Sequence, residues 1–338
     1  MAQPGMHVDP QQIWQIMTGF QHSAAFKAAV ELEVFTKIGE GNKTNAAIAE
    51  ACGAAERGIR ILTDTLTVIG LLNKSNGEYS LTDTSAAFLD KNSQTYLGSM
   101  VEFIMSPAQR RGFDDLTNAV RHGGSNIQGE ASLDPESPMW VTFAKAMAPM
   151  MMGSAQMIPE HIGGDRDRKI KVLDIAAGHG IFGIMVAKAF PNAEIYALDW
   201  QNVLTVATEN AAKFGVSDRH HLIPGSAFEA DFGDDYDVVL VTNFLHHFDA
   251  DTCTSFMAKV NRSLKSDGKA MTLEFVPNDD RVSPPAEALF SLVMLAATPA
   301  GDAYTFAELR AMMENARFSR NEHIPLVPLP QHLIVSQK

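Results

Sequence analysis

Short apolar runs alternate with segments of helical periodicity over the second half of the chain. The runs have the length and aliphatic character of buried strands, and the segments between them repeat apolar residues every three or four positions. Strands are predicted at Lys169–Ile175, Ala193–Trp200, His221–Pro224, Asp237–Thr242, Ala270–Val276 and His332–Ser336. Helices are predicted at Ile181–Phe190, Asn202–Phe214, Ala250–Leu264 and Phe306–Ala316. This α/β alternation predicts a doubly wound, mostly parallel Rossmann-like sheet, with the last strand at an edge and ligands at the carboxyl ends of the strands.

The first hundred residues show a helical pattern followed by a hairpin. Helices are predicted at Ile13–Ile38, Asn45–Cys52 and Glu56–Leu72, and a hairpin at Asn73–Ser80. The dipeptide Asn76-Gly77 is the strongest short hairpin signal. Three helices and a hairpin predict a mainly α, winged-helix domain, which either binds DNA or makes a protein contact. The third helix offers only Arg57 and Arg60 to base edges, and acidic neighbours oppose them, so a protein contact is favoured.

The middle of the chain, residues 95–160, is helical in pattern, with interruptions at Pro107, at Gly123-Gly124 and in the loop 134–138. Residues 139–157 are rich in methionine. Such a cluster either fills a hydrophobic core or lines a pocket for a flat apolar ligand, because the thioether side chain is flexible and polarizable. The polar link 163–168 predicts a domain boundary before the sheet.

Composition and charge narrow the function classes. The 338 residues are 46% hydrophobic, which suffices for two domains with real cores. A net charge of −13 disfavours nucleic acid or an anionic membrane as the main partner. Cys52 and Cys253 lie far apart without metal-ligand spacing, so we expect no metal site and no disulfide. No signal peptide or membrane-spanning run is recognisable, which predicts a cytoplasmic protein.

A Gly-rich turn follows the first predicted strand. Gly178 and Gly180 allow a ligand to lie against the main chain, and Gly183 permits close packing of the helix. This spacing, with Asp199 about 20 positions on, is also the dinucleotide fingerprint, so the motif alone does not select the cofactor. Asp174, inside the strand, favours a cationic sulfonium ligand over a pyrophosphate.

With this turn and these acids, the chain resembles the S-adenosylmethionine-dependent O-methyltransferases of the plant and bacterial small-molecule type. The resemblance is loose over the first 100 residues and close from Lys169 on. It implies a winged-helix domain at 1–100 that forms a homodimer, a helical linker and pocket roof at 101–165, and an S-adenosylmethionine-binding domain at 166–338. It implies as cofactor-binding residues Asp174, Ala176, Gly178, Gly180, Asp199, Trp200, Gly225, Ser226, Ala227, Phe228, Asn243 and Phe248.

Two adjacent histidines directly follow the fourth predicted strand, at the end where a cofactor on the Gly-rich turn would project its reactive group. Imidazole titrates near neutral pH, so a base is expected here. By resemblance, His246 is the catalytic base, and Glu274, at the end of the fifth strand, is the buried acid that orients it. His247 stands where the family usually has Asp, and Phe248 replaces a Trp that covers the adenine.

The chain departs from the family pattern at two further positions. The second acid of the plant enzymes falls at Ala303, which cannot serve, and Asp302 is one residue away. The adenine-side motif has no acid either, so Ser226 or the backbone would hydrogen-bond the adenine. The segment Leu289–Thr298 is implied as a pocket wall. Substrate contacts are implied for Met147, Met151, His247, Phe290, Met294 and Thr298.

The sequence therefore predicts a homodimeric S-adenosylmethionine-dependent methyltransferase that acts on a hydroxyl of a small, mostly apolar, aromatic metabolite. Three alternatives stay open. The first is a protein of the same fold that binds S-adenosylmethionine without transferring methyl, the second is a winged-helix regulator, and the third is a nicotinamide enzyme.

Overall fold

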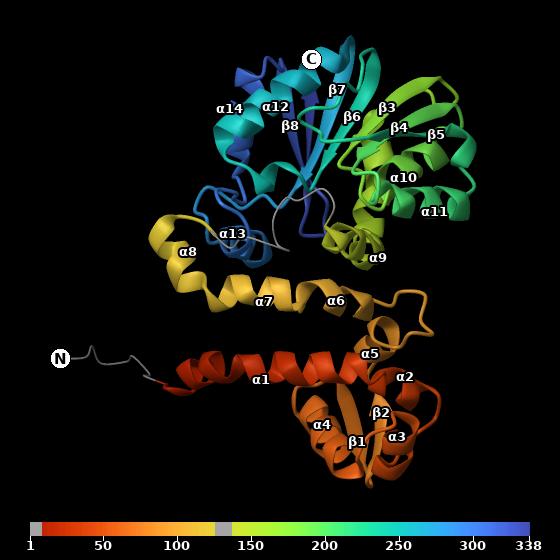
Figure 1. The fold of residues 1–338 in the computed structure, drawn as a ribbon, viewed down its shortest axis with the longest axis vertical. Coiled ribbons are helices and arrows are strands. Elements are labelled where there is room, and N and C mark those ends of the chain that lie inside the picture. The colour runs from red at the N-terminus through yellow and green to blue at the C-terminus, as the bar shows by residue number, and fades with distance from the viewer. Residues whose placement is uncertain (1–8, 126–136) are drawn as a thin grey trace, which may run out of the picture. The chain divides into compact units, whose positions relative to one another are not determined.

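The chain divides into two compact units in the computed structural model, which describes residues 9–125 and 137–338 (Figure 1). The units are Met1–Met105 and Ser106–Lys338. The predicted helical linker at 101–165 is therefore divided, because residues 101–105 belong to the first unit and the described residues after them to the second. Most of the predicted loop 134–138 lies outside the described residues.

Helices and one hairpin form the first unit. Its elements are α1 (Gln11–Glu31), α2 (Val34–Gly39), α3 (Asn45–Ala51), α4 (Glu56–Val68), β1 (Leu72–Ser75), β2 (Glu78–Leu81), α5 (Asp83–Phe88), the 3-10 turn η1 (Gly98–Met100) and α6 (Val101–Ile104). The prediction of one continuous helix at Ile13–Ile38 is wrong, because Glu33 takes a left-handed φ of 57° and separates α1 from α2. The predicted hairpin is confirmed, with Asn76 and Gly77 at φ values of 50° and 82°, as a type I′ turn requires.

A seven-stranded sheet forms the centre of the second unit, in the order β5-β4-β3-β6-β7-β9-β8. The strands are β3 (Ile170–Ile175), β4 (Ala193–Asp199), β5 (His220–Pro224), β6 (Tyr236–Thr242), β7 (Leu264–Glu274), β8 (Arg320–Pro325) and β9 (His332–Gln337). The first five are parallel, and β9 is antiparallel to both of its neighbours. This confirms the predicted doubly wound, mostly parallel sheet.

One detail of the predicted sheet is wrong. The strand at His332–Ser336, expected at an edge, lies inside the sheet as β9, and the unpredicted β8 forms that edge. β8 is mostly polar and only partly buried, so it carries no apolar run that a pattern search could find. An edge strand with polar residues is a common protection against further strand pairing.

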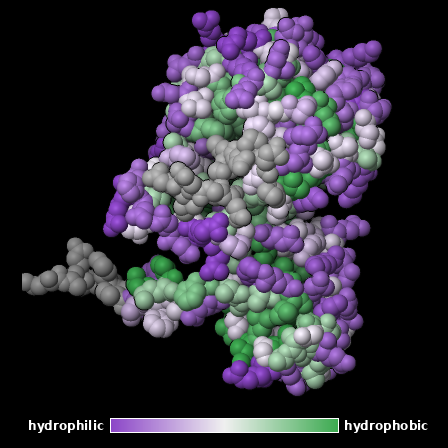
Figure 2. Space-filling model, in the orientation of Figure 1, coloured by the Kyte–Doolittle hydropathy of each residue, from purple (hydrophilic) through white to green (hydrophobic). Residues whose placement is uncertain are grey.

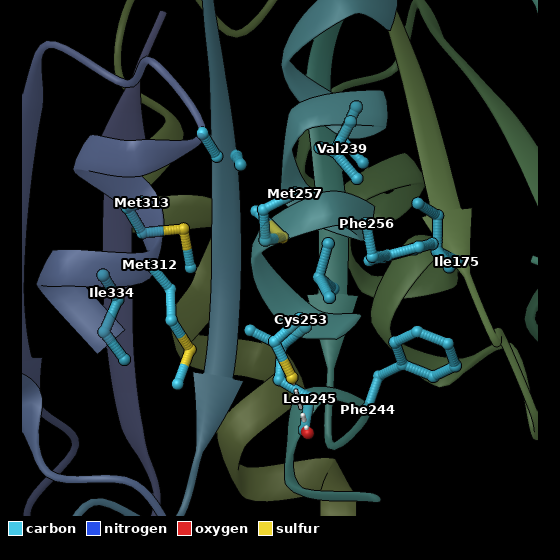
Figure 3. Close-up of a cluster of buried hydrophobic side chains, with 14 of the residues drawn as sticks. Ile175, Val239, Phe244, Leu245, Cys253, Phe256, Met257, Met312, Met313 and Ile334 are labelled. Atoms are coloured by element: carbon cyan, nitrogen blue, oxygen red, sulfur yellow. Dashed lines mark hydrogen bonds between the residues drawn. The ribbon is translucent and has the colours of Figure 1, made fainter. Parts of the chain in front are cut away.

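Helices cover both faces of this sheet (Figure 1). The helices and 3-10 turns of the second unit are α7 (Pro107–Asp114), α8 (Leu116–His122), α9 (Pro138–Ile162), α10 (Ile181–Ala189), α11 (Leu204–Phe214), η2 (Ser217–Arg219), η3 (Leu245–His247), α12 (Ala250–Ser263), α13 (Pro285–Ala297) and α14 (Phe306–Asn315). On one face, Phe256 and Met257 of α12 and Met312 and Met313 of α14 pack on strand residues such as Val239 (Figure 3).

The opposite face carries a second core, formed with α9 and α10. One buried cluster includes Val172 and Leu240 of the sheet together with Ile158 and Ile162 of α9 and Ile184 of α10. Of the methionines in residues 139–157, Met151 is buried in this core, and Met147, Met150, Met152 and Met157 pack against it. The two cores together hold the carboxyl ends of β3, β4, β6 and β7 in fixed positions.

Candidate active site

The turn after β3 has the backbone conformation that its glycines predict. Gly178 and Gly180 have φ values of 57° and 72°, and Ala176 takes a left-handed φ of 51°. A Cβ atom on Gly183 would lie 2.6 Å from Ile195 Cγ2 and 2.9 Å from Asp174 Oδ2. The absence of that Cβ lets α10 approach the sheet closely and brings its first turn next to Asp174.

Two carboxyl groups lie beside this turn. Asp174 is fully buried, and its Oδ2 accepts the Gly183 N–H at 2.9 Å, whereas its Oδ1 has no partner among the described residues. Burial raises its pKa to about 7, which the Gly183 bond opposes and the nearby Asp199 reinforces. Asp199 accepts the N–H groups of Gly178 and Trp200, each at 2.7 Å, and burial raises its pKa to about 6. The turn is thus acidic, with one carboxyl oxygen free to meet a ligand.

The adenine-side motif Gly225–Phe228 lies directly beside Asp199, because the Gly225 N–H donates to the Asp199 carbonyl at 2.9 Å. Ser226 Oγ accepts the Phe228 N–H at 3.2 Å. The Phe228 ring contacts the rings of Phe248, Phe244 and Phe256, with the Phe248 centroid 4.9 Å away. The structure therefore brings the predicted residues 225–228 and Phe248 together with Asp199.

Lys259 of α12 supports this loop and was missed by the sequence analysis. Its ammonium group donates to the carbonyls of Ala227, Phe228 and Ala230 at 3.1, 3.0 and 2.8 Å. Burial lowers the pKa of Lys259, and the ammonium lies 4.4 Å from the centre of the Phe232 ring. A lysine on an amphipathic helix normally faces water, so the sequence carried no signal for this role.

His246 and Glu274 form a buried pair at the carboxyl ends of β6 and β7. The Nδ1 atom of His246 lies 2.5 Å from Glu274 Oε2, and only 5% and 3% of the two residues are exposed. Glu274 Oε1 accepts the backbone N–H groups of Phe244 and Leu245 at 3.0 and 2.8 Å. Every oxygen of the carboxylate is thereby engaged, and the imidazole orientation is fixed.

Aromatic rings surround this pair. The His247 ring centre lies 4.4 Å from that of His246 and 6.3 Å from that of Trp140, and burial together with His246 holds the pKa of His247 well below its usual range. The Phe290 ring meets the His246 ring edge to face at 4.9 Å. Trp140 was not predicted as a site residue, and its indole N–H is buried with no partner among the described residues.

The other predicted substrate residues differ in how far they are buried. Met147 is partly buried, while Met151 and Met294 are buried. The hydroxyl of Thr298 donates to the Met294 carbonyl and accepts the Gly301 N–H, both at 2.8 Å, so backbone groups already engage it. Gly301 was missed by the sequence analysis: a Cβ there would lie 2.2 Å from the His246 carbonyl oxygen.

The second acid of the family pattern has no counterpart at this position. Ala303 is fully buried, and Asp302 forms an ion pair with Arg281 at 3.1 Å. Arg281 also pairs with Glu308. Asp302 is therefore held by a neighbouring arginine in the structure, and the Glu274 carboxylate is the acid in contact with His246.

Within 9–125 and 137–338, no three His, Cys, Asp or Glu side chains are grouped as metal ligands. In the same part of the chain, none of the helices combines the length and the apolar character needed to cross a bilayer. Cys52 and Cys253 are both free thiols, and Cys253 donates to the Leu245 carbonyl at 3.1 Å (Figure 3).

Two family models match the chain, one in each unit. A family model described as the O-methyltransferase domain matches residues 165–319, and one described as the O-methyltransferase dimerisation domain matches residues 14–91. A crystal structure from Nostoc punctiforme PCC 73102, assigned as an O-methyltransferase, is 49% identical with a TM-score of 0.94, over 98% of this chain and 100% of that chain.

Two named relatives are more distant. The mitomycin biosynthesis 6-O-methyltransferase of Streptomyces lavendulae is 25% identical over 94% of this chain and 92% of its own length. The 3-hydroxy-5-methyl-1-naphthoate 3-O-methyltransferase of Streptomyces sahachiroi is 25% identical over 93% of this chain and 90% of its own length. The chain is thus similar to these proteins over nearly its whole length.

Proposed function

Since the chain belongs to the O-methyltransferase family, we propose that His246 is the general base for methyl transfer to a hydroxyl of a small, mostly apolar, aromatic metabolite. The protein is a methyltransferase of the small-molecule type, and S-adenosylmethionine is the methyl donor of this family.

The buried hydrogen bond between His246 and Glu274 carries the proposal. A carboxylate only accepts hydrogen bonds, so the proton of the neutral imidazole is on Nδ1 and the basic lone pair is on Nε2. When Nε2 removes a proton from a hydroxyl, the Glu274 charge stabilises the imidazolium that forms. A phenol gains most from such a base, because deprotonation makes it a strong nucleophile.

The acidic Gly-rich turn fits a cationic sulfonium cofactor. Asp174 offers a buried oxygen without a partner among the described residues, and the oxygens of Asp199 keep lone pairs for ribose hydroxyls after accepting two backbone bonds. The glycines at 178 and 180 leave the main chain open to close approach. When bound, the cofactor supplies an electrophilic methyl group, and the protein contributes mainly by positioning the nucleophile.

The ring-lined surroundings of His246 support a flat, mostly apolar substrate. His247, Phe290 and Trp140 present aromatic faces and edges near the base, and the predicted methionines add adaptable apolar surface. The Streptomyces sahachiroi relative is named for a hydroxylated naphthoate, which is an aromatic substrate of this kind. His247, neutral because its pKa is low, would hydrogen-bond a polar group beside the reacting hydroxyl.

The first unit supports a homodimer rather than a regulator that binds DNA. Ile13, Trp14, Met17 and Phe20 of α1 are each at least 60% exposed, and Figure 2 shows hydrophobic side chains along this helix. Residues 14–91 match the dimerisation domain, so we assign this apolar face to a second copy. Around α4, Arg60 and Lys74 both pair with Asp64, which leaves few free cations for phosphates.

A methyl-transfer assay tests the base assignment. Purified protein is incubated with S-adenosylmethionine carrying a labelled methyl group and a panel of phenols and hydroxynaphthoates. We expect His246→Ala to lower kcat by about 10²- to 10⁴-fold and Glu274→Gln to lower it less, with cofactor affinity unchanged by calorimetry. Transfer by His246→Ala at the wild-type rate would remove the base role while leaving the family assignment intact.

The same assay separates the enzyme from a protein that only binds the cofactor. Wild-type protein that binds S-adenosylmethionine and S-adenosylhomocysteine but labels none of a broad panel of hydroxyl compounds would favour the binding protein. Wild-type protein that binds NAD and neither adenosyl ligand would contradict the placement of the cofactor at Gly178 and Gly180.

A further inference from the structure

Asn243 lies beside the Gly-rich turn at the carboxyl end of β6. Its backbone N–H donates to the Leu273 carbonyl at 2.8 Å, and its φ of 51° is a left-handed value that asparagine tolerates better than most residues. In the sheet, Val241 pairs with Ile175 of β3, so the residues that follow these two strands are neighbours. The side chain of Asn243 is therefore placed where a ligand on the turn extends toward β6.

A buried chain of polar groups fixes the direction of the Asn243 amide. Its Nδ2 atom donates to Met151 Sδ at 3.4 Å, and the same sulfur accepts Gln331 Nε2 at 3.1 Å. Ser154 Oγ in turn donates to Gln331 Oε1 at 2.5 Å. A thioether sulfur cannot donate, so both amides must turn their nitrogen toward Met151. The oxygen of Asn243 consequently points away from the sulfur.

This network is inside the protein. Met151, Ser154 and Gln331 are 4%, 0% and 1% exposed. The Asn243 Oδ1 atom is itself buried and has no hydrogen-bond partner among the described residues. Buried carbonyl oxygens in native proteins nearly always have a donor, and an unpaired one in a ligand site indicates that the ligand supplies it.

We propose that Gln331 and Ser154, acting through the sulfur of Met151, orient Asn243 so that its Oδ1 accepts a hydrogen bond from the ammonium group of the cofactor's amino-acid arm. The inference rests on the cofactor placement proposed above. The strand order is β4-β3-β6, with Asp199 at the end of β4 and Asn243 after β6. A cofactor whose ribose lies at Asp199 and which crosses the end of β3 brings its other end, the amino-acid arm, to Asn243.

The ammonium group is the donor of that arm, and a carbonyl that bonds a cation makes a stronger hydrogen bond than one that bonds a neutral donor. Asn243 is thus a binding residue, while Gln331 and Ser154 are positioning residues. Within the described residues, no hydrogen bond joins any of the three to residues 225–228, so we expect their effect to be confined to ligands that carry the amino-acid arm.

Calorimetry with two ligands tests the proposal. S-adenosylhomocysteine has the arm and 5′-methylthioadenosine lacks it, while both share the nucleoside. We expect Asn243→Gly, which tolerates the left-handed φ, to weaken S-adenosylhomocysteine about tenfold and 5′-methylthioadenosine less than twofold. Gln331→Leu, and the milder Ser154→Ala, should weaken only S-adenosylhomocysteine, by about threefold or more, because the amide is then free to turn.

Thr272→Val is the matched control, because Thr272 is buried on β7 outside this network, its hydroxyl has no partner in the described part of the chain, and valine keeps its shape. It should change neither affinity. Equal losses for both ligands in Asn243→Gly, or an unchanged S-adenosylhomocysteine affinity with a raised substrate KM, would overturn the proposal. Wild-type protein that binds neither ligand would instead contradict the cofactor site itself.

Discussion

Asp174 and Asp199 place two carboxyl groups of raised pKa beside one turn. A structural role alone would be served by an ordinary low pKa, since an ionised carboxylate accepts backbone N–H bonds more strongly. Their burial without a cation instead leaves the free protein partly protonated near neutral pH, with pKa values of about 7 and 6. This state is what a site for a cationic ligand should show before the ligand arrives.

Cofactor binding should therefore release protons. At pH 6.5 Asp174 is largely protonated in the free protein, and a bound sulfonium and ammonium favour the ionised form, which lowers both pKa values. We expect release of up to about one proton at pH 6.5. At pH 8.5 both carboxyl groups are already ionised and release none, while the cofactor's α-amino group, with a pKa of about 8, takes up a proton to bind as an ammonium. Calorimetry in buffers of different ionisation enthalpy measures this number.

An isosteric variant identifies the carboxyl group that releases the proton when the cofactor binds. Asp174→Asn removes the group with the higher pKa, so its proton release at pH 6.5 should fall well below that of the wild type. Proton uptake at pH 6.5, or release that is the same at both pH values, would show that these carboxyls do not respond to the cofactor charge.

At the scale of elements, the close contact between α10 and the sheet depends on Gly183, which has no Cβ atom. Gly183 is the third residue of α10, and its Cβ would overlap Ile195 Cγ2 and Asp174 Oδ2. Gly58 holds the same position in α4, and nothing lies within 4 Å of a Cβ there. The two glycines share a helix position and differ only in what surrounds them.

Substitution by alanine should lower the free energy of unfolding at Gly183 but not at Gly58. Gly183→Ala is expected to lower the free energy of unfolding by about 1 to 3 kcal/mol, because the core must shift to admit the methyl group. Gly58→Ala should be neutral or stabilise by up to about 1 kcal/mol through helix propensity. Urea unfolding followed by circular dichroism measures both, and equal effects would contradict the overlap at Gly183.

The elements that carry apolar patterns were predictable, and those defined by long-range contacts were not. The strands β3, β4 and β6 and the turn at Gly178 follow from local sequence, and so does the placement of His246 after β6. The edge strand β8 has no apolar run, and the break at Glu33 depends on one left-handed residue.

The same distinction applies to the site. Glu274 was predicted through a family pattern, and its contact with His246 at 2.5 Å agrees with that expectation. Lys259, Gly301 and the network of Gln331 act through partners 29 to 180 residues away in the chain. No local signal identifies such contacts, because a lysine on a helix or a glycine in a loop is ordinary until its partner is known.

At the scale of the whole molecule, the apolar face of α1 is the surface that we assign to a second copy. Trp14 and Phe20 are 66% and 70% exposed, although aromatic side chains of this size usually dominate cores and interfaces. The family model described as a dimerisation domain matches from residue 14 on, so Trp14, Met17 and Phe20 lie within it. A net charge of −13 for each chain opposes association, which means that the apolar contact must provide the attraction.

Charge placed on that face should therefore dissociate the proposed dimer. We expect wild-type protein to sediment as a dimer, and the double variant Trp14→Glu and Phe20→Glu as a monomer at micromolar concentration, because carboxylates cannot be buried against an apolar partner. Val68→Glu is the control, since Val68 is 84% exposed on α4, outside α1. A double variant that remains dimeric would place the contact elsewhere. A monomer with unchanged S-adenosylhomocysteine affinity would show that the second unit binds its cofactor without the partner chain.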